Sequence, residues 1–221
     1  MKRTKVCDRS LPGYTQKEET LNCLTHALGA VFAVIALILC LVFAKDTPAR
    51  VSGAVYCLSM VALFVTSATY HGLKKEYTKK IWQVIDHCII YLMIVGSYMP
   101  MLVTGLYPYN RKYFFIVLAA LLVFAGIGAT FTAIDVNKYK PVTMATYMII
   151  GWCFVLLIKM LRSVFPTALL WWILAGGIAI TCGTVLYLFG HKRRYFHSVF
   201  HAAVDAGAIL MFIGIFKYCI T

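Results

Sequence analysis

The chain has 221 residues, of which 62% are hydrophobic and only 13% are charged, and its mean hydropathy is +0.81. Soluble globular domains contain about 45–50% apolar and about 25% charged residues. The composition therefore excludes a soluble domain and predicts an integral membrane protein. The formal net charge of +13 does not indicate nucleic-acid binding, because the basic residues lie almost entirely between apolar stretches.

Seven apolar stretches follow one another along the chain. A helix that crosses a membrane needs about 17–25 apolar residues, so we expect one helix from each stretch. The predicted fold is an all-α integral membrane protein, a seven-transmembrane-helix bundle, with a basic and flexible tail over 1–17 and a single transmembrane domain over 18–221. The stretches are 20–44, 51–73, 87–110, 113–134, 141–158 and 163–190, all free of charged residues, and about 195–216, interrupted only by Asp205.

The basic residues are distributed unequally between the two ends of these helices. The N-terminal tail and the loops after the second, fourth and sixth helices hold 14 lysines and arginines, whereas the opposite side holds 7. Because positive residues concentrate on the cytoplasmic side, we expect a cytoplasmic N-terminus and an external C-terminus in a multi-pass cell-membrane protein. The polar first twenty residues give no indication of a signal peptide. Anionic lipid headgroups are expected beside the basic loops.

The seventh stretch carries a polar stripe. His197, His201 and Asp205 are spaced by four residues, so they share one face of a helix. Polar side chains within a membrane are costly and normally point into the protein. Two imidazoles one turn apart can hold a metal ion, as in H-E-x-x-H helices. The alternative is a pair of hydrogen-bonded interior histidines without metal.

Chain direction brings further polar residues to the same depth. The second helix runs opposite to the first, third and seventh, so its last residues lie level with their first residues. This layer comprises Glu19, Asn22, His26, Ser67, His71, Asp86, His197 and His201. For Glu19, Asn22 and His26, which share one helix face, two interpretations stay open. In the first, they contribute to capping the helix and His26 lies at the membrane interface. In the second, they form a polar cluster that lines a cytoplasmic cavity.

Three histidines in this layer suggest a catalytic metal site. Three neutral imidazoles and one water are the usual arrangement of catalytic zinc, and His71, His197 and His201 can supply them. Asp86 could orient a histidine or take a proton from water. Ser67, one turn before His71, could hydrogen-bond that water or a substrate carbonyl.

Smaller features concern helix ends and bends. Pro100 interrupts the third stretch and predicts a kink. Pro141 is suited to the first turn of the fifth helix. Asp135 is interpreted as an interfacial residue, and His191 as a solvated loop residue.

Together, these motifs resemble the hemolysin III proteins, the bacterial branch of the progestin and adipoQ receptor (PAQR) superfamily, over residues 18–219. The motifs are Glu19-x-x-Asn22-x-x-Thr25-His26, Ser67-x-x-x-His71, Asp86-His87 with a following Gly-Ser-Tyr-x-Pro, and His197-x-x-x-His201. The resemblance implies zinc held by His71, His197 and His201, with Ser67 and Asp86 as neighbours. Asp205 is not part of the family pattern. The superfamily includes alkaline ceramidases, which hydrolyse a lipid amide.

The leading functional hypothesis is therefore a zinc-dependent hydrolase that cleaves a lipid amide or ester and contributes to membrane-lipid homeostasis. Its expected partners are membrane lipids and zinc, with no nucleic acid. The alternatives are a non-enzymatic sensor with structural zinc and a haemolytic protein, as the family name suggests. A transporter is a further alternative, because intramembrane His and Asp can relay protons, although no inverted repeat is evident.

Overall fold

The computed structural model describes residues 4–190 and 193–221, so His191 lies outside the described residues. Within them, seven helical spans are long and apolar enough to cross a membrane, which confirms the predicted seven-helix class. The helices are α1 (Gln16–Phe43), α2 (Thr47–Gly72), α3 (Glu76–Met101), α4 (Tyr107–Tyr109), α5 (Arg111–Ile134), α6 (Lys140–Trp152), α7 (Phe154–Val164), α8 (Thr167–Gly190) and α9 (Phe196–Ile215). A π-helix, Leu102–Leu106, joins α3 to α4, and another, Phe216–Ile220, extends α9.

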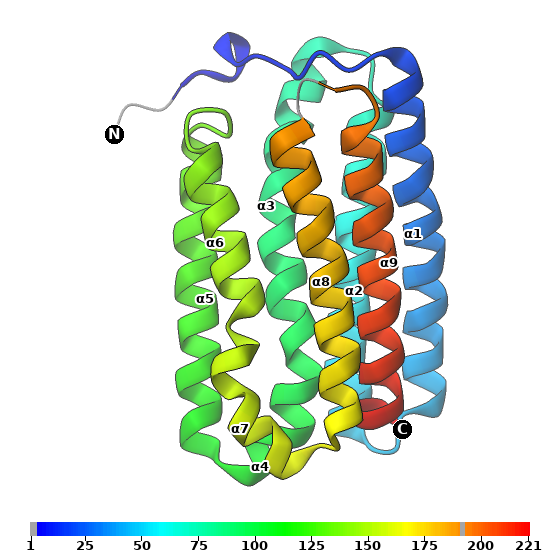
Figure 1. Ribbon diagram of the computed structural model, residues 1–221, viewed down its shortest axis with the longest axis vertical. Coiled ribbons are helices and arrows are strands. Elements are labelled where there is room, and N and C mark those ends of the chain that lie inside the picture. The colour runs from blue at the N-terminus through cyan, green and yellow to red at the C-terminus, as the bar shows by residue number, and fades with distance from the viewer. Residues whose placement is uncertain (1–3, 191–192) are drawn as a thin grey trace.

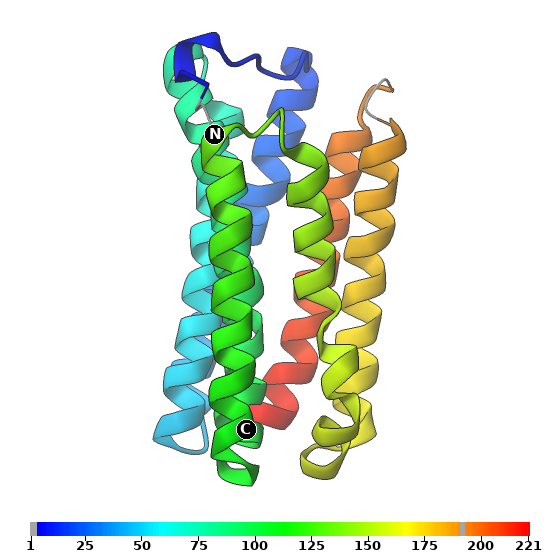
Figure 2. The ribbon, with the colours of Figure 1, turned by 90° about the vertical axis from the view of Figure 1, so that its left-hand side faces the viewer.

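The spans run up and down in chain order and form a ring (Figures 1 and 2). Each span packs on the next along the chain, and α9 returns to pack against α1. The two chain ends lie at opposite ends of the bundle (Figure 1), and we call the one with the N-terminus the N-terminal end. Many large apolar side chains on the outside, such as Leu28 and Leu156, are exposed because lipid would cover them. Which end faces the cytoplasm stays a prediction.

The first span begins at Gln16, two residues before the start of the predicted transmembrane domain, 18–221. Thr15 is its N-cap: the Thr15 side chain accepts from the Glu18 amide, and the Glu18 carboxylate accepts from the Thr15 amide at 2.9 Å. This reciprocal capping box satisfies two backbone donors that a helix start otherwise leaves unpaired. Glu18, rather than Glu19, therefore caps α1.

Pro100 and Tyr98 mark two irregular stretches in the walls. The irregularity expected at Pro100 takes the form of the π-helix that follows it, so the third span continues to Tyr109. The break between α6 and α7 at Cys153 was not predicted. The Tyr98 hydroxyl donates to the carbonyls of Ile150 (2.8 Å) and Gly151 (3.0 Å) and accepts from the Phe154 amide (3.1 Å). A side chain from α3 thus satisfies backbone groups that the interrupted helix leaves free.

The α8 and α9 backbones approach each other closely at two glycines. A Cβ added to Gly176 would lie 2.7 Å from the Gly207 carbonyl oxygen, and one added to Gly207 would lie 2.8 Å from the Gly176 carbonyl oxygen. Small residues permit such close helix contacts in membranes, where packing replaces the hydrophobic effect as the force between helices. This contact fixes α9, which carries two of the candidate ligands.

Candidate metal centre

Three histidines meet near the N-terminal end of the bundle. His71 lies in the last turn of α2, and His197 and His201 lie in the first two turns of α9. His197 Nε2 is 3.3 Å from His71 Nε2 and 3.0 Å from His201 Nε2. One ligand atom from each histidine lies within 4.8 Å of the others, so the group could hold a metal ion. The structure thus brings together the three histidines selected from the sequence.

The hydrogen-bond partners of the histidines determine which ring nitrogen of each carries a proton. His71 Nδ1 lies 2.7 Å from Glu19 Oε2, and His201 Nδ1 lies 3.2 Å from the Asn22 carbonyl oxygen. Both partners are acceptors, so each Nδ1 carries a proton and each neutral ring turns an Nε2 lone pair toward His197. His197 Nε2 can carry only one proton, which cannot form good hydrogen bonds with the Nε2 lone pairs of both His71 and His201. A cation bound by all three Nε2 atoms would satisfy them, so these residues fit a metal ion.

The polar face of α1 points into the bundle. Glu19 contacts His71, and the Asn22 amide oxygen accepts from the Ser198 hydroxyl at 2.6 Å. The His26 ring stacks on the His201 ring with centroids 3.7 Å apart. Of the two interpretations left open by the sequence, the polar cluster beside a cavity is therefore the one that the geometry supports.

A strained residue sets the start of α9. Tyr195 has φ 66° in the left-handed region, which is uncommon for a residue other than glycine. Its amide donates to Glu18 Oε1 at 2.8 Å, so the carboxylate that caps α1 also holds the turn into α9. This contact fixes the position of His197, two residues later.

The N-terminal segment, residues 4–15, crosses the N-terminal end of the bundle (Figure 1). Arg9 donates to the Ala133 carbonyl at 2.9 Å and the Ile134 carbonyl at 2.8 Å, which tie the segment to the end of α5. At its other end, the Tyr14 ring stacks on His197 with centroids 4.8 Å apart and an angle of 10°. The segment therefore covers the histidine group.

Asp135 anchors this segment and directly follows the last residue of α5. The Thr4 hydroxyl and the Lys138 amide both donate to its carboxylate. Burial alone would raise the pKa of Asp135, but these hydrogen bonds outweigh it, so the pKa lies below its ordinary value.

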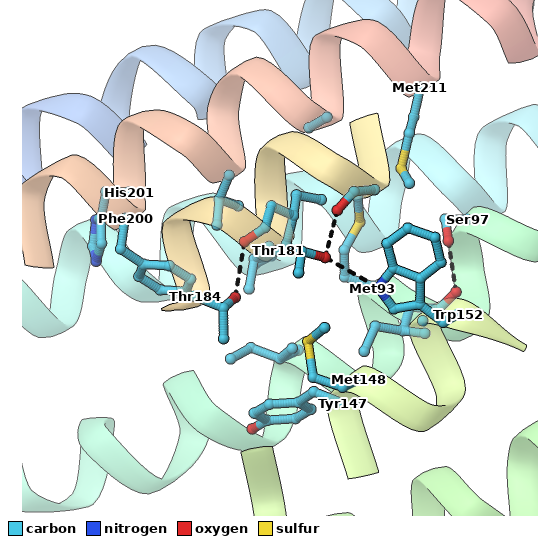
Figure 3. Close-up of a pocket in the computed structure, with 18 of the residues that line it drawn as sticks. Met93, Ser97, Tyr147, Met148, Trp152, Thr181, Thr184, Phe200, His201 and Met211 are labelled. Atoms are coloured by element: carbon cyan, nitrogen blue, oxygen red, sulfur yellow. Dashed lines mark hydrogen bonds between the residues drawn. The ribbon is translucent and has the colours of Figure 1, made fainter. Parts of the chain in front are cut away.

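A cavity of about 190 Å³ extends from the histidines into the bundle. Ser67, Asp86 and His201 line its polar end, and Asp86 lies within hydrogen-bonding reach of Ser67. The rest of the wall is mainly methionine, aliphatic and aromatic. In Figure 3, His201 and Phe200 lie at one end of the cavity, and Trp152 and Met211 lie well away from them. Such a cavity suits a molecule with one polar group and an apolar body.

Asp86 and Ser67 lie beside the histidine group without being part of it. Neither supplies one of the grouped ligand atoms, and Asp86 Oδ2 lies 3.5 Å from His87 Nδ1. The His87 ring also lines the cavity but contacts the Gln83 carbonyl at 2.8 Å. Asp86 therefore lines the cavity but is not one of the grouped ligands.

Asp205 continues the stripe away from the metal group. Its Oδ1 is buried without a hydrogen-bond partner among the described residues, and it lies 2.6 Å from a Cβ built on Gly29. Among the described residues, Asp205 is therefore not grouped with the three histidines as a possible ligand, although it shares their helix face.

Sequence reasoning missed the contact between Tyr14 and His197 and the partners of Lys79. Tyr14 lies in a polar tail with no periodic pattern, and Lys79 reads as one of several loop lysines. No local signal distinguishes them, because their partners lie on other helices.

The fold and site define the class of this protein: a multi-pass membrane protein with a buried three-histidine group inside a seven-helix bundle. Residues 14–212 match the family described as Haemolysin-III related. The chain belongs to this hemolysin III family, within the PAQR superfamily, as its motifs indicated, and is a bacterial-type multi-pass membrane protein.

Similar proteins span most of the chain. It is 30% identical over 205 residues to "Hemolysin-3" of Bacillus cereus, covering 91% of this chain and 92% of the relative. It is 29% identical over 210 residues to "Hemolysin-3 homolog" of Bacillus subtilis (strain 168), covering 94% and 97%. The human "Monocyte to macrophage differentiation factor" is 25% identical over 209 residues, covering 91% and 84%.

Proposed function

We propose that the histidine group binds zinc and that the protein hydrolyses an amide or ester bond of a membrane lipid. The convergence of three Nε2 atoms at the polar end of an apolar cavity supports this proposal most directly. Zinc with three histidine ligands keeps a position open and, when bound, activates water for attack on a carbonyl.

The chain's own residues supply the remaining chemistry. The Asp86 carboxylate lines the cavity and would accept a proton from a water beside the histidines. Ser67 lines the same end and can donate its hydroxyl proton to Asp86 or to a substrate carbonyl. Together they would hold the reacting group, while the apolar wall holds the remainder of the molecule and excludes water.

The composition of the wall supports a lipid substrate. Met93, Met148 and Met211 line the cavity, and methionine adapts to irregular apolar shapes. Helices α6 and α8 form one side of the cavity wall and contact each other through few residues. One of these contacts is the hydrogen bond from Trp152 Nε1 to the Thr181 hydroxyl at 3.0 Å. A lipid that enters sideways from the membrane would place its polar linkage at the histidine end.

The first experiment measures metal in protein purified in detergent. About one zinc ion per chain is expected, and a His197→Ala/His201→Ala double variant should lose most of it. His87→Gln is the matched control, because His87 is a half-buried cavity histidine outside the group and its loss should leave the metal content unchanged. Metal-free wild-type protein, or a double variant that retains the ion, would overturn the proposed centre.

The second experiment separates catalysis from a structural metal. Long-chain amides and esters are presented in liposomes, with and without a chelator. Asp86→Asn should keep the zinc and the fold but lose turnover by about 100-fold or more, as expected for a general base. The hydrolase proposal fails if zinc-loaded wild type cleaves no such lipid while Asp86→Asn still abolishes the effect of the protein on cells that express it. The non-enzymatic sensor would then be the better explanation.

A further inference from the structure

The Glu19 carboxylate contacts the histidine group, and the Lys79 ammonium contacts that carboxylate. Among residues 4–190 and 193–221, Glu19 is the only acid whose carboxylate hydrogen-bonds one of the three grouped histidines. We propose that Glu19 is the positioning residue of the metal centre, holding the His71 ring for coordination, and that Lys79 holds Glu19 in place. This inference rests on the proposed metal site and adds the layer that orients it.

The two oxygens of Glu19 have different partners. Oε2 lies 2.7 Å from His71 Nδ1, and Oε1 lies 3.0 Å from Lys79 Nζ. A carboxylate held at both oxygens cannot rotate freely, and its side chain is only 13% exposed. It therefore fixes both the proton on His71 Nδ1 and the plane of the ring, which leaves Nε2 directed at His197.

Lys79 also fixes the backbone that carries His71. Its ammonium contacts the carbonyl oxygens of Tyr70 at 3.0 Å, His71 at 3.3 Å and Leu73 at 3.2 Å. These carbonyls belong to the C-terminal end of α2, where helical acceptors lack intrahelical partners and a cation is favoured. One ion pair between α1 and α3 thus holds both the ring and the main chain of a candidate ligand.

The competing explanation is a salt bridge that only joins α1, α2 and α3. A purely structural pair would affect stability without affecting the geometry of bound metal. An orienting carboxylate would change metal affinity by about 10–100-fold when removed, the usual effect of a residue behind a metal-bound histidine. The two explanations therefore predict different results for the same variants.

The test compares Glu19→Ala, Glu19→Gln and wild type in detergent. Zinc affinity is measured by competition with a chromophoric chelator, and ligand geometry by the visible absorption of bound Co²⁺. Glu19→Ala should weaken zinc binding by about 10–100-fold and change the Co²⁺ spectrum. Glu19→Gln should recover most of the affinity, because its amide oxygen still accepts from His71 Nδ1.

Glu76→Gln is the control, since Glu76 lies at the same end of the bundle but its exposed side chain pairs with Lys80, four residues later on the same helix. It should match wild type in both measurements. If wild type binds zinc and Glu19→Ala binds it equally well with an unchanged Co²⁺ spectrum, the positioning inference is wrong while the metal centre stands. Wild type that binds neither ion overturns both.

Discussion

Replacing Gly207 by alanine tests whether the α8–α9 contact determines the position of the histidines. The new Cβ would lie 2.5 Å from Ile180 Cγ1 and 2.8 Å from the Gly176 carbonyl oxygen. The isoleucine can change rotamer, but the carbonyl belongs to a helix and cannot turn away. Since ordinary contact begins at 3.4 Å, the backbones must separate by roughly 0.6 Å, which is 3.4 less 2.8.

Overpacking of this kind costs about 1–3 kcal/mol. Alanine also improves helix propensity by about 1 kcal/mol over glycine, so a matched glycine is needed for comparison. Gly126 in α5 provides it, because a Cβ added there meets nothing within 4 Å. Propensity contributes equally to both variants, so the free energy of unfolding should be lower by about 1–3 kcal/mol for Gly207→Ala than for Gly126→Ala.

The same substitution should weaken metal binding. His201 lies less than two turns before Gly207 on the same helix, and ligand distances in metal sites tolerate only about 0.2 Å. Unfolding in detergent and competition with a chelator measure the two effects. Equal stability and equal metal affinity in Gly207→Ala and Gly126→Ala would refute the reasoning from the backbone contact.

Two further predictions concern topology and the broken helix. In a cysteine-free background, a single cysteine that replaces Lys75 should react with a labelling reagent only from the cytoplasm, and one that replaces Arg111 only from outside. This expectation follows from the 14-to-7 distribution of basic residues. Labelling of position 75 from outside would mean that the orientation is the reverse. Tyr98→Phe keeps the ring but removes the acceptor of the Phe154 amide and the side-chain donor to the Gly151 carbonyl, so the free energy of unfolding should fall by about 1–3 kcal/mol. A variant as stable as wild type would mean that the break between α6 and α7 does not depend on this hydroxyl.

The spans could be predicted from the sequence because each satisfies its backbone within itself. In lipid, a helix must pair every interior N–H and C=O locally, so apolar length alone indicates it. For the same reason the face shared by His197 and His201 was predictable, since i and i+4 positions are neighbours in any helix. His71 could be assigned to the same site as these two histidines because alternating chain direction places the end of α2 level with the start of α9.

Only the tertiary structure decided which side chains contact one another across helices. The sequence left Glu19 between capping and a cavity cluster, and the structure assigns capping to Glu18 and places Glu19 against His71 and Lys79. The break at Cys153 is likewise contacted by a hydroxyl from α3, which no pattern within α6 could indicate.

The physical reason lies in how helices associate in a membrane. The rotation and register of each helix follow from many small packing contacts, such as the one between Gly176 and Gly207, together with a few interhelical hydrogen bonds. None of these is encoded within one segment. The sequence by itself therefore determined the helices, the polar layer and the three histidines, whereas the packing of α1 and α3 against α2 and α9 decided which side chains contact them.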